Sequence, residues 1–210
     1  MAKNSSAHMG MRQTSDTIIA MRRAWIIAIV SLTLAACGSG STATTVACVS
    51  PFWNSVFATC LPTGWKVLSS ENLRALGVPE ETITAFQVTE PRGGQFDTVT
   101  VTQEPLAQDL TTTDYSQANV AAVTSLPDYK LLDKSVVYID GKESALHVFT
   151  ARSAANNPIR RYYQLGAVKE RTGYTFTGSF PLSITDAEAN EVGFILKNVS
   201  FVDPATVVKK

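Results

Sequence analysis

The stretch that decides the fold, residues 130–180, reads KLLDKSVVYIDGKESALHVFTARSAANNPIRRYYQLGAVKERTGYTFTGSF. Segments rich in valine, tyrosine, phenylalanine and threonine alternate in it with short turn sequences, a pattern that is typical of consecutive antiparallel strands. Asp140-Gly141 in particular is a strong signal for a two-residue hairpin. We therefore predict a meander of four strands, at residues 130–139, 143–152, 159–170 and 174–180.

Helical patterns flank this meander on both sides. Apolar residues recur at helical spacing in residues 186–197, which follow Thr185 as N-cap, and in residues 115–126, which follow Asp114. Because such helices can cover the apolar faces of a meander, the predicted class is α+β, with a mostly antiparallel central sheet flanked by helices. The other predicted elements are helices at 70–76 and 79–83, strands at 85–90, 98–103 and 199–202, and a hairpin turn at Gly93-Gly94.

Residues 1–36 have the pattern of an export signal. Arg22 and Arg23 precede the uncharged run AWIIAIVSLTLAA (24–36), which is shorter than the ~20 residues of a membrane-spanning helix. The run ends directly before Cys37 in LAAC (34–37), which resembles the bacterial lipoprotein signal, where the cysteine sulfur takes a lipid. The alternatives are an ordinary cleaved signal and a structural cysteine in a buried helix. Residues 1–20 are polar, so we interpret them as an over-long gene start or an extended n-region.

A short tether and a pair of cysteines follow the signal. Residues 37–47 include the small polar run GSGSTATT, which cannot bury enough apolar area to fold, so we predict a flexible lipid-anchored tether. If Cys37 carries a lipid, Cys48 and Cys60 are the two cysteines that remain to pair with each other. An exported chain also meets an oxidising compartment, where disulfides form. We therefore predict a Cys48–Cys60 disulfide at the start of a single domain, residues 48–210.

Several segments, taken in order, resemble the PsbP-like domains. Pro62-Thr63-Gly64-Trp65 is similar to their P-x-G-W opening, and YKLL (129–132) leading to Asp140-Gly141-Lys142 is similar to one of their strands and its turn. The resemblance covers about residues 61–202, and the family includes the PsbP extrinsic photosystem proteins and bacterial lipoproteins of the DcrB and LpqN kind. It implies an α/β/α sandwich and a role in binding or assisting other proteins rather than catalysis. The remaining similar segments are RYYQ (161–164), GYTFT (173–177) and residues 192–201.

No sequence pattern in the chain indicates a catalytic, nucleic-acid-binding or metal-binding site. The 18 basic and 18 acidic residues cancel, and a net charge of zero argues against a nucleic-acid partner. His147 is the only histidine that remains after the predicted cleavage, and it alternates with apolar residues in a strand pattern. The three cysteines and two histidines are too few for a zinc framework. We expect no enzymatic activity, no cofactor and no bound metal.

One group of charges is concentrated enough to suggest a binding surface. Basic residues flank the strands on either side of Asn156-Asn157-Pro158, and a basic sheet edge suits an acidic partner or lipid headgroups. The alternative is a strand edge that charge protects from aggregation. The predicted basic edge consists of Arg152, Arg160, Arg161, Lys169 and Arg171.

Together these features predict a membrane-anchored, extracytoplasmic lipoprotein of non-enzymatic type that acts through protein contacts or assembly support. The expected location is the cell membrane or the outer membrane, facing outside the cytoplasm, with the lipid on Cys37 as the membrane contact. The second hypothesis is a small-molecule or lipid-binding carrier, which a cavity lined by Trp65, Tyr163 and Phe176 would favour. A hydrolase ranks last, because it requires a convergent polar cluster with a perturbed carboxylate in a pocket.

Overall fold

The computed structural model describes residues 45–75 and 78–206. Strands dominate this part of the chain, and the longest of them fall in the segment that the sequence marks as a meander. The elements in chain order are β1 (Ser50–Trp53), β2 (Ala58–Leu61), β3 (Trp65–Leu68), α1 (Ser70–Ala75), β4 (Thr82–Val88), β5 (Thr98–Pro105), α2 (Thr112–Val123), β6 (Lys130–Ile139), β7 (Lys142–Ala151), β8 (Arg160–Lys169), β9 (Thr172–Phe180), α3 (Asp186–Lys197) and the 3-10 turn η1 (Pro204–Thr206).

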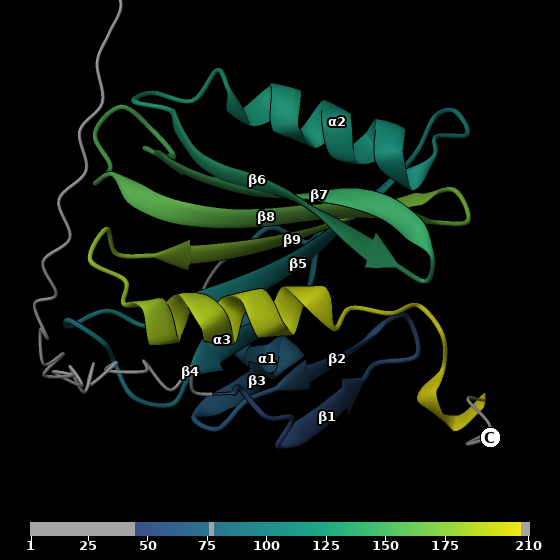
Figure 1. Cartoon of the computed structure of the whole chain (residues 1–210), viewed down its shortest axis with the longest axis horizontal. Helices are drawn as coiled ribbons and strands as arrows, with labels where there is room; N and C mark the ends of the chain where they lie inside the picture. The colour runs from purple at the N-terminus through teal and green to yellow at the C-terminus, as the bar shows by residue number, and fades with distance from the viewer. Residues whose placement is uncertain (1–44, 76–77, 207–210) are drawn as a thin grey trace, which may run out of the picture. The chain divides into compact units, whose positions relative to one another are not determined.

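The larger of two sheets has seven strands in the order β3-β4-β5-β9-β8-β7-β6, and all neighbours in it are antiparallel. Strands β6 to β9 form the predicted meander, and β5 pairs with the free side of β9. The edges of the large sheet are therefore β3 and β6 (Figure 1). The predicted α+β class with a mostly antiparallel sheet is confirmed.

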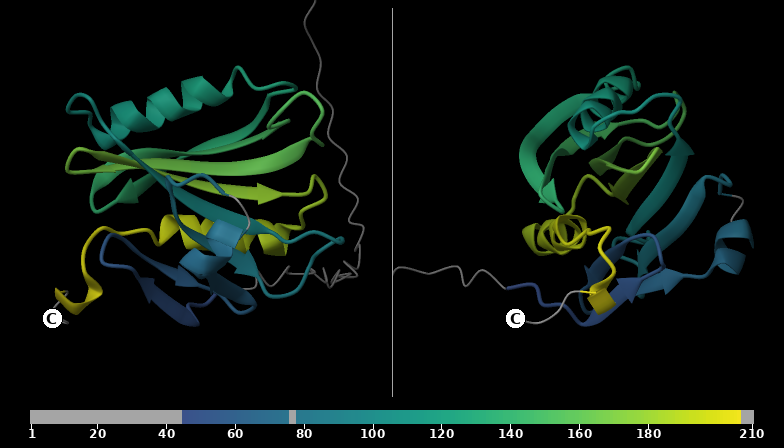
Figure 2. Two further views of the ribbon diagram at one scale, coloured as in Figure 1. Left: turned by 180° about the vertical axis from the view of Figure 1, so that it is seen from behind. Right: turned by 90° about the vertical axis from the view of Figure 1, so that its right-hand side faces the viewer.

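Helices cover both faces of this sheet, as the sandwich prediction requires. α2 packs on β7 and β8, whereas α3 packs on the opposite face, against β6, β8 and strand β2 of the small β1–β2 sheet. Figure 1 shows α2 and α3 on opposite sides of the central strands, and Figure 2 shows the same layers from behind and from the side. Both faces of β7 and β8 are consequently buried, which explains why their sequences are apolar on both sides.

Two glycines of β9 let the helices approach the sheet closely. A Cβ at Gly173 would lie 2.5 Å from the ring of Tyr115 in α2. A Cβ at Gly178 would lie 2.6 Å from the ring of Phe180 and 3.0 Å from Val192 in α3. Glycine at these strand positions therefore serves helix packing, which outweighs its poor strand propensity.

The main apolar core lies on the α3 face of the sheet. Phe57, between β1 and β2, is fully buried and meets Phe176 of β9 edge to face, with ring centroids 5.1 Å apart. Its ring also lies 6.4 Å from that of Phe86 in β4. The β1–β2 hairpin is thus fixed to the large sheet by aromatic contacts, each worth about 0.5–1.5 kcal/mol beyond the area that it buries.

The predicted Cys48–Cys60 disulfide is present, with the two Cα atoms 5.5 Å apart. It joins the residue two positions before β1 to β2, and the amide of Val49 donates to the Leu61 carbonyl beside it. The tether as far as residue 44, including Cys37, and the whole predicted signal of residues 1–36 lie outside the described residues.

The structure corrects three sequence predictions. α2 begins at Thr112, one turn before the predicted start, because the hydroxyl of Thr111 caps it by accepting from the Asp114 amide. The predicted helix at 79–83 is wrong, since β4 begins at Thr82 and pairs with both β3 and β5. The predicted strand at 199–202 is reduced to a single bridge between Ser200 and Ala58.

Candidate functional site: the β6 edge and its two grooves

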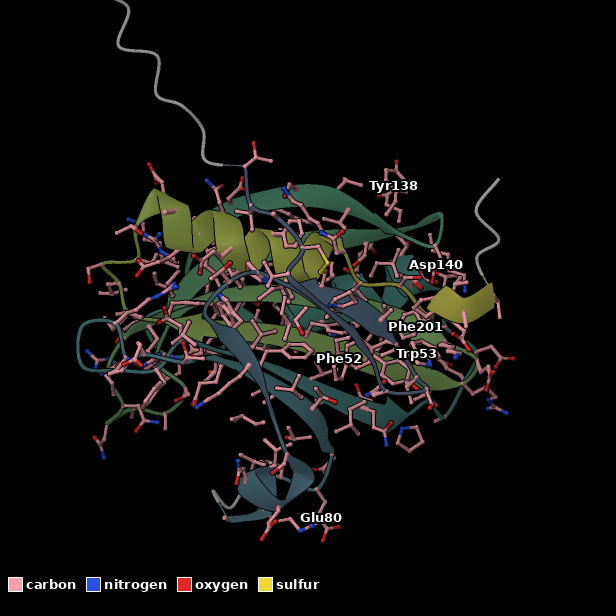
Figure 3. The ribbon with its side chains drawn as sticks, turned by 90° about the horizontal axis from the view of Figure 1, so that it is seen from below. Phe52, Trp53, Glu80, Tyr138, Asp140 and Phe201 are labelled. Atoms are coloured by element: carbon pink, nitrogen blue, oxygen red, sulfur yellow. A yellow bond between two sulfur atoms is a disulfide. The ribbon has the colours of Figure 1, made fainter. Side chains whose placement is uncertain are left out.

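Strand β6 is an unusually apolar sheet edge. Four large hydrophobic side chains of this strand are exposed, and Val136 and Tyr138 keep 57% and 65% of their surface. In Figure 3 Tyr138 projects from the rim of the domain. Native proteins normally cover an edge strand or place charges on it, because the free backbone groups of the edge can pair with a strand of another chain. The exposed hydrophobic residues of β6 are Leu131, Leu132, Val136 and Tyr138.

The backbone of β6 also has a free hydrogen-bonding side. Ile139 and Lys142 flank a two-residue turn, so they form a hydrogen-bonded pair, and the pairs alternate in type along an antiparallel ladder. The amide and carbonyl groups of Lys134, Val136 and Tyr138 therefore point away from β7. Within residues 45–75 and 78–206, no strand lies against that side of β6.

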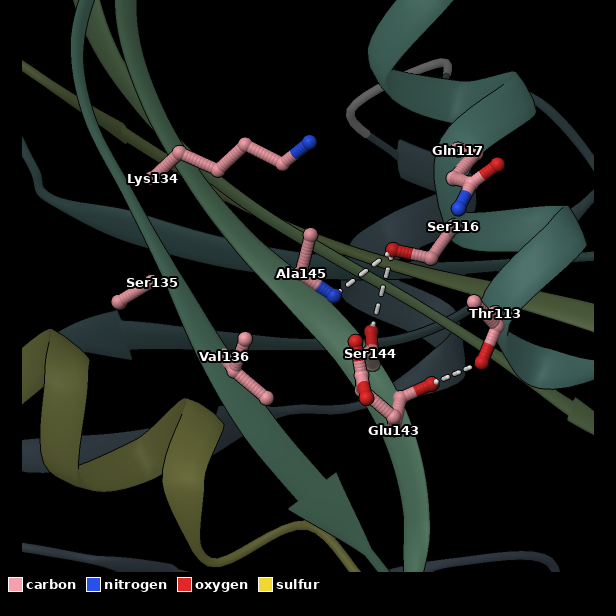
Figure 4. A pocket seen from close by; sticks show the side chains of 9 residues that line it. All are labelled: Thr113, Ser116, Gln117, Lys134, Ser135, Val136, Glu143, Ser144 and Ala145. Carbon is pink, nitrogen blue, oxygen red and sulfur yellow. Dashed lines mark hydrogen bonds between the residues drawn. The ribbon is translucent and has the colours of Figure 1, made fainter.

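A groove of about 250 Å³ separates β6 from α2, as Figure 4 shows. Its walls are Lys134 and Val136 of β6 and Gln117 of α2. At its base, β7 pairs with β8 only from Leu146 onward, and serine side chains fill the gap that results. Ser116 accepts from the Ala145 amide at 2.9 Å, and Ser144 donates to the Gly166 carbonyl at 2.6 Å. Both serines thus satisfy backbone groups at the base of the groove.

A second groove, of about 460 Å³, lies on the opposite face, between α3 and the strands β6 to β8. Its floor consists of the buried residues Leu146, Val148 and Tyr163. Thr45 and Val46, where the described chain begins, line it as well. The predicted tether therefore joins the domain beside this groove, and β6 contributes one wall to each of the two grooves.

The sequence-based carrier cavity is only partly present. Tyr163 lines the α3 groove, as predicted. Trp65 and Phe176 instead belong to the packed core, with 6% and 1% of their surface exposed. The predicted lining was wrong for these two residues because Phe176 packs on Phe57, between β1 and β2, and Trp65 donates to Glu191 of α3 at 2.9 Å, outside the groove.

The most perturbed carboxylate belongs to a cluster around Arg92. Arg92 contacts Asp97 at 3.6 Å, Glu188 at 3.6 Å and Glu191 at 2.8 Å, and thereby ties the loop before β5 to α3. Asp97 is 1% exposed, and burial raises its pKa to about 6 even though the positive charge of Arg92 opposes the shift. Asp97 lines neither groove, so the pocket that a hydrolase requires is not associated with this carboxylate.

His147 is buried in an aromatic cluster on the α2 face. Its Nε2 lies 2.9 Å from the Tyr129 hydroxyl, and its ring centroid lies 4.9 Å from that of Phe149. Burial lowers the pKa of the His147 imidazole, and the nearby charge of Lys134 lowers it further. Its burial among aromatic rings and its hydrogen bond to Tyr129 are those of a core histidine. No group of three metal-ligating side chains is brought together within the residues that the structure describes.

The predicted basic edge is wrong as a description of the sheet. β8 pairs with β7 on one side and β9 on the other, so its basic residues are not at an edge. The ten residues of β8 also separate them into two groups roughly 30 Å apart. One group is Arg152, Arg160 and Arg161, and the other is Lys169 and Arg171.

Most of these basic side chains have local partners. Arg152 pairs with Asp128, and Arg171 lies 3.2 Å from Asp109. Arg160 donates to Ser179 at 2.8 Å and also to Gln95, and Lys169 donates to a backbone carbonyl. A role for either group in partner binding stays a prediction, and the exposed residues of β6 are the surface that sequence reasoning missed.

None of the helices described here is long and apolar enough to span a membrane.

Comparisons with known proteins establish the fold and nothing finer. No family model matches the chain, and no curated protein matches its sequence significantly. LpqN from Mycobacterium tuberculosis, described as involved in cell envelope biogenesis, superposes with a TM-score of 0.56 at 13% identity, over 73% of this chain and 90% of that one. The cyanobacterial PsbP, CyanoP, from Synechocystis has a TM-score of 0.50 at 13% identity, over 80% of this chain and 99% of that one. The domain therefore has the PsbP-like fold that its sequence motifs predict.

Proposed function

We propose that this protein is a lipid-anchored, non-enzymatic domain outside the cytoplasm, which acts by binding other proteins through its β6 edge. The observation that carries the proposal is the coincidence, on one strand, of free backbone groups and exposed apolar side chains. Extended segments bind such edges by adding a strand, with backbone hydrogen bonds for affinity and side-chain grooves for specificity. The groove on each face of β6 supplies such contacts.

Two further features support the location and the absence of catalysis. A disulfide between Cys48 and Cys60 is the form expected in an oxidising compartment, which agrees with the signal pattern before Cys37. The buried polar groups near the grooves serve structural bonds, since Ser116 and Ser144 satisfy strand backbone and His147 contacts Tyr129.

The α3 groove favours the second candidate function, a carrier of small apolar molecules. Its volume of about 460 Å³ falls in the range of ligand pockets, and its floor is mainly apolar. We rank this function second because the groove is open along Asn190 and Lys197, and because it does not explain the exposed side chains on the other side of β6.

Site-specific photo-crosslinking in native membranes distinguishes the two functions. Benzoylphenylalanine replaces Tyr138 at the edge, Phe194 in the α3 groove, or Val67 on the opposite edge strand as the control. We expect protein adducts from position 138 well above those from position 67. Small lipid adducts from position 194, with no protein adduct from position 138, would instead establish the carrier and contradict the proposal.

A further inference from the structure

We propose that the strand that docks on β6 is the β6 strand of a second copy of this chain, in antiparallel register about Val137. This inference rests on the proposed function, because it names the partner of the same edge. In such a dimer the two seven-stranded sheets become one continuous sheet, and each copy contributes the same surface.

The free backbone groups allow this register. The backbone amide and carbonyl groups of Lys134, Val136 and Tyr138 point away from β7. Two antiparallel strands form hydrogen bonds where residues of this kind in one strand lie opposite residues of this kind in the other. Pairing about Val137 places Val136 opposite Tyr138 of the second copy, and Ser135 opposite Ile139. The bulge between Leu131 and Asp133 interrupts the ladder of β6, and the strand ends at Ile139, because Asp140 lies in the turn with a φ of 49°. The regular part available for pairing is therefore residues 134–139.

Side-chain chemistry selects this register over its neighbours. Val136 opposite Tyr138 is a pair of a β-branched and an aromatic residue, which stabilises antiparallel sheets by roughly 0.2–1 kcal/mol. A register shift of two residues in one direction places Lys134 opposite Tyr138 of the second copy. A shift of two residues in the other direction places Val136 opposite the turn residue Asp140. Asp140 is a turn residue whose carboxylate accepts from the Ser200 hydroxyl and the Phe201 amide, each at 2.7 Å, so it does not extend the strand. Of these three registers, only pairing about Val137 places both Val136 and Tyr138 opposite an apolar or aromatic side chain of the second strand.

The tethers are placed correctly for two copies on one membrane. Residues that face each other across antiparallel strands lie on the same side of the sheet, so both α3 helices of the dimer lie on one face. The described chain begins on that face, at Thr45 and Val46 beside α3. Both tethers therefore leave the dimer on the same face and can lead to one bilayer.

The size of the contact predicts a weak dimer. Residues 135–139 of each strand face each other, and an interface of this length is below the small end of stable ones. Confinement of two tethered copies to one membrane raises their effective concentration, which compensates for low affinity. Crosslinking in membranes is therefore the suitable measurement.

The experiment uses the full-length chain in native membranes with Val136→Cys and Tyr138→Cys combined. These exposed positions tolerate substitution, and the register brings position 136 of each copy opposite position 138 of the other. Mild oxidation is expected to convert most of the chain to a reducible species of twice the mass. The matched control is Lys66→Cys with Leu68→Cys, which has the same spacing on edge strand β3, and it is expected to stay monomeric.

Two outcomes would overturn the inference. One is a self-crosslink no stronger than that of the β3 control, in a chain whose thermal unfolding matches that of the parent. The other is a disulfide from positions 136 and 138 to a different protein, which would preserve the proposed function and reject the second copy. If crosslinking succeeds but depends neither on the membrane nor on Cys37, the dimer stands and the anchoring part of the proposed function fails.

Discussion

Gly173→Ala is expected to destabilise the domain by about 2–4 kcal/mol, because overpacking costs about 1–3 kcal/mol and a lost hydrogen bond adds about 1 kcal/mol. The new methyl group would lie 2.5 Å from the ring of Tyr115. That ring cannot move aside, since its hydroxyl donates to Glu104 at 2.7 Å and lies 3.0 Å from the Thr175 hydroxyl. Burial raises the pKa of Tyr115 to about 12, so these bonds persist over the whole physiological pH range. Thermal unfolding followed by circular dichroism measures the effect.

The control for this prediction is Gly193→Ala in α3. A Cβ at Gly193 meets no atom within 4 Å, and alanine in a helix interior is favoured over glycine by about 0.5–1 kcal/mol. This variant should be slightly more stable than the parent. Adding Tyr115→Leu to Gly173→Ala should cost less than the sum of the two single changes, because the smaller side chain removes the clash. Additive effects would show that α2 does not press on β9 at this position.

Loss of the disulfide is expected to have the second largest effect. The bond closes a loop between residues 12 positions apart, and chain entropy assigns such a loop about 3 kcal/mol. Cys48→Ala combined with Cys60→Ala should therefore lower the free energy of unfolding by about 2–3 kcal/mol. Alanine suits position 60, which is buried in β2. The loss should appear first in the β1–β2 hairpin, as faster amide exchange around Phe57, whose ring packs on Phe176.

A reducing agent provides the matched comparison. It should lower the midpoint of unfolding of the parent to that of the double alanine variant, and leave the variant itself unchanged. An equal shift in both proteins would mean that the reductant acts elsewhere. No shift in the parent would mean that the bond contributes nothing to stability.

The meander, α3 and its cap could be predicted from the sequence because their signals are local. Alternating apolar residues around Asp140-Gly141 define β6 and β7, and Thr185 forms a reciprocal capping box with Glu188 at the start of α3. The Cys48–Cys60 bond could be predicted because only these two cysteines remain once Cys37 is assigned to the lipid. In contrast, β1, β2 and β3 were not predicted. These strands have only four residues each, and two of them depend on distant partners, since β3 pairs with β4 and β2 packs on α3.

The candidate site could not be predicted for the same physical reason. A meander of four strands has two ends, β6 and β9, and only the pairing of β9 with β5 decides that β6 is the edge. The exposure of Val136 and Tyr138 depends on that pairing and on the place of α2, which covers β7 and β8 and leaves β6 open. Their sequence alone is that of an ordinary buried strand.

The most direct test of the account is the intact mass of the protein purified from membranes. We predict a chain that begins at Cys37 and carries a diacylglycerol there. We also predict that the Cys37→Ser variant is fully released from the membrane fraction. A chain of full length, without lipid and located in the cytosol would contradict the anchor, the compartment and the shared orientation of the two tethers.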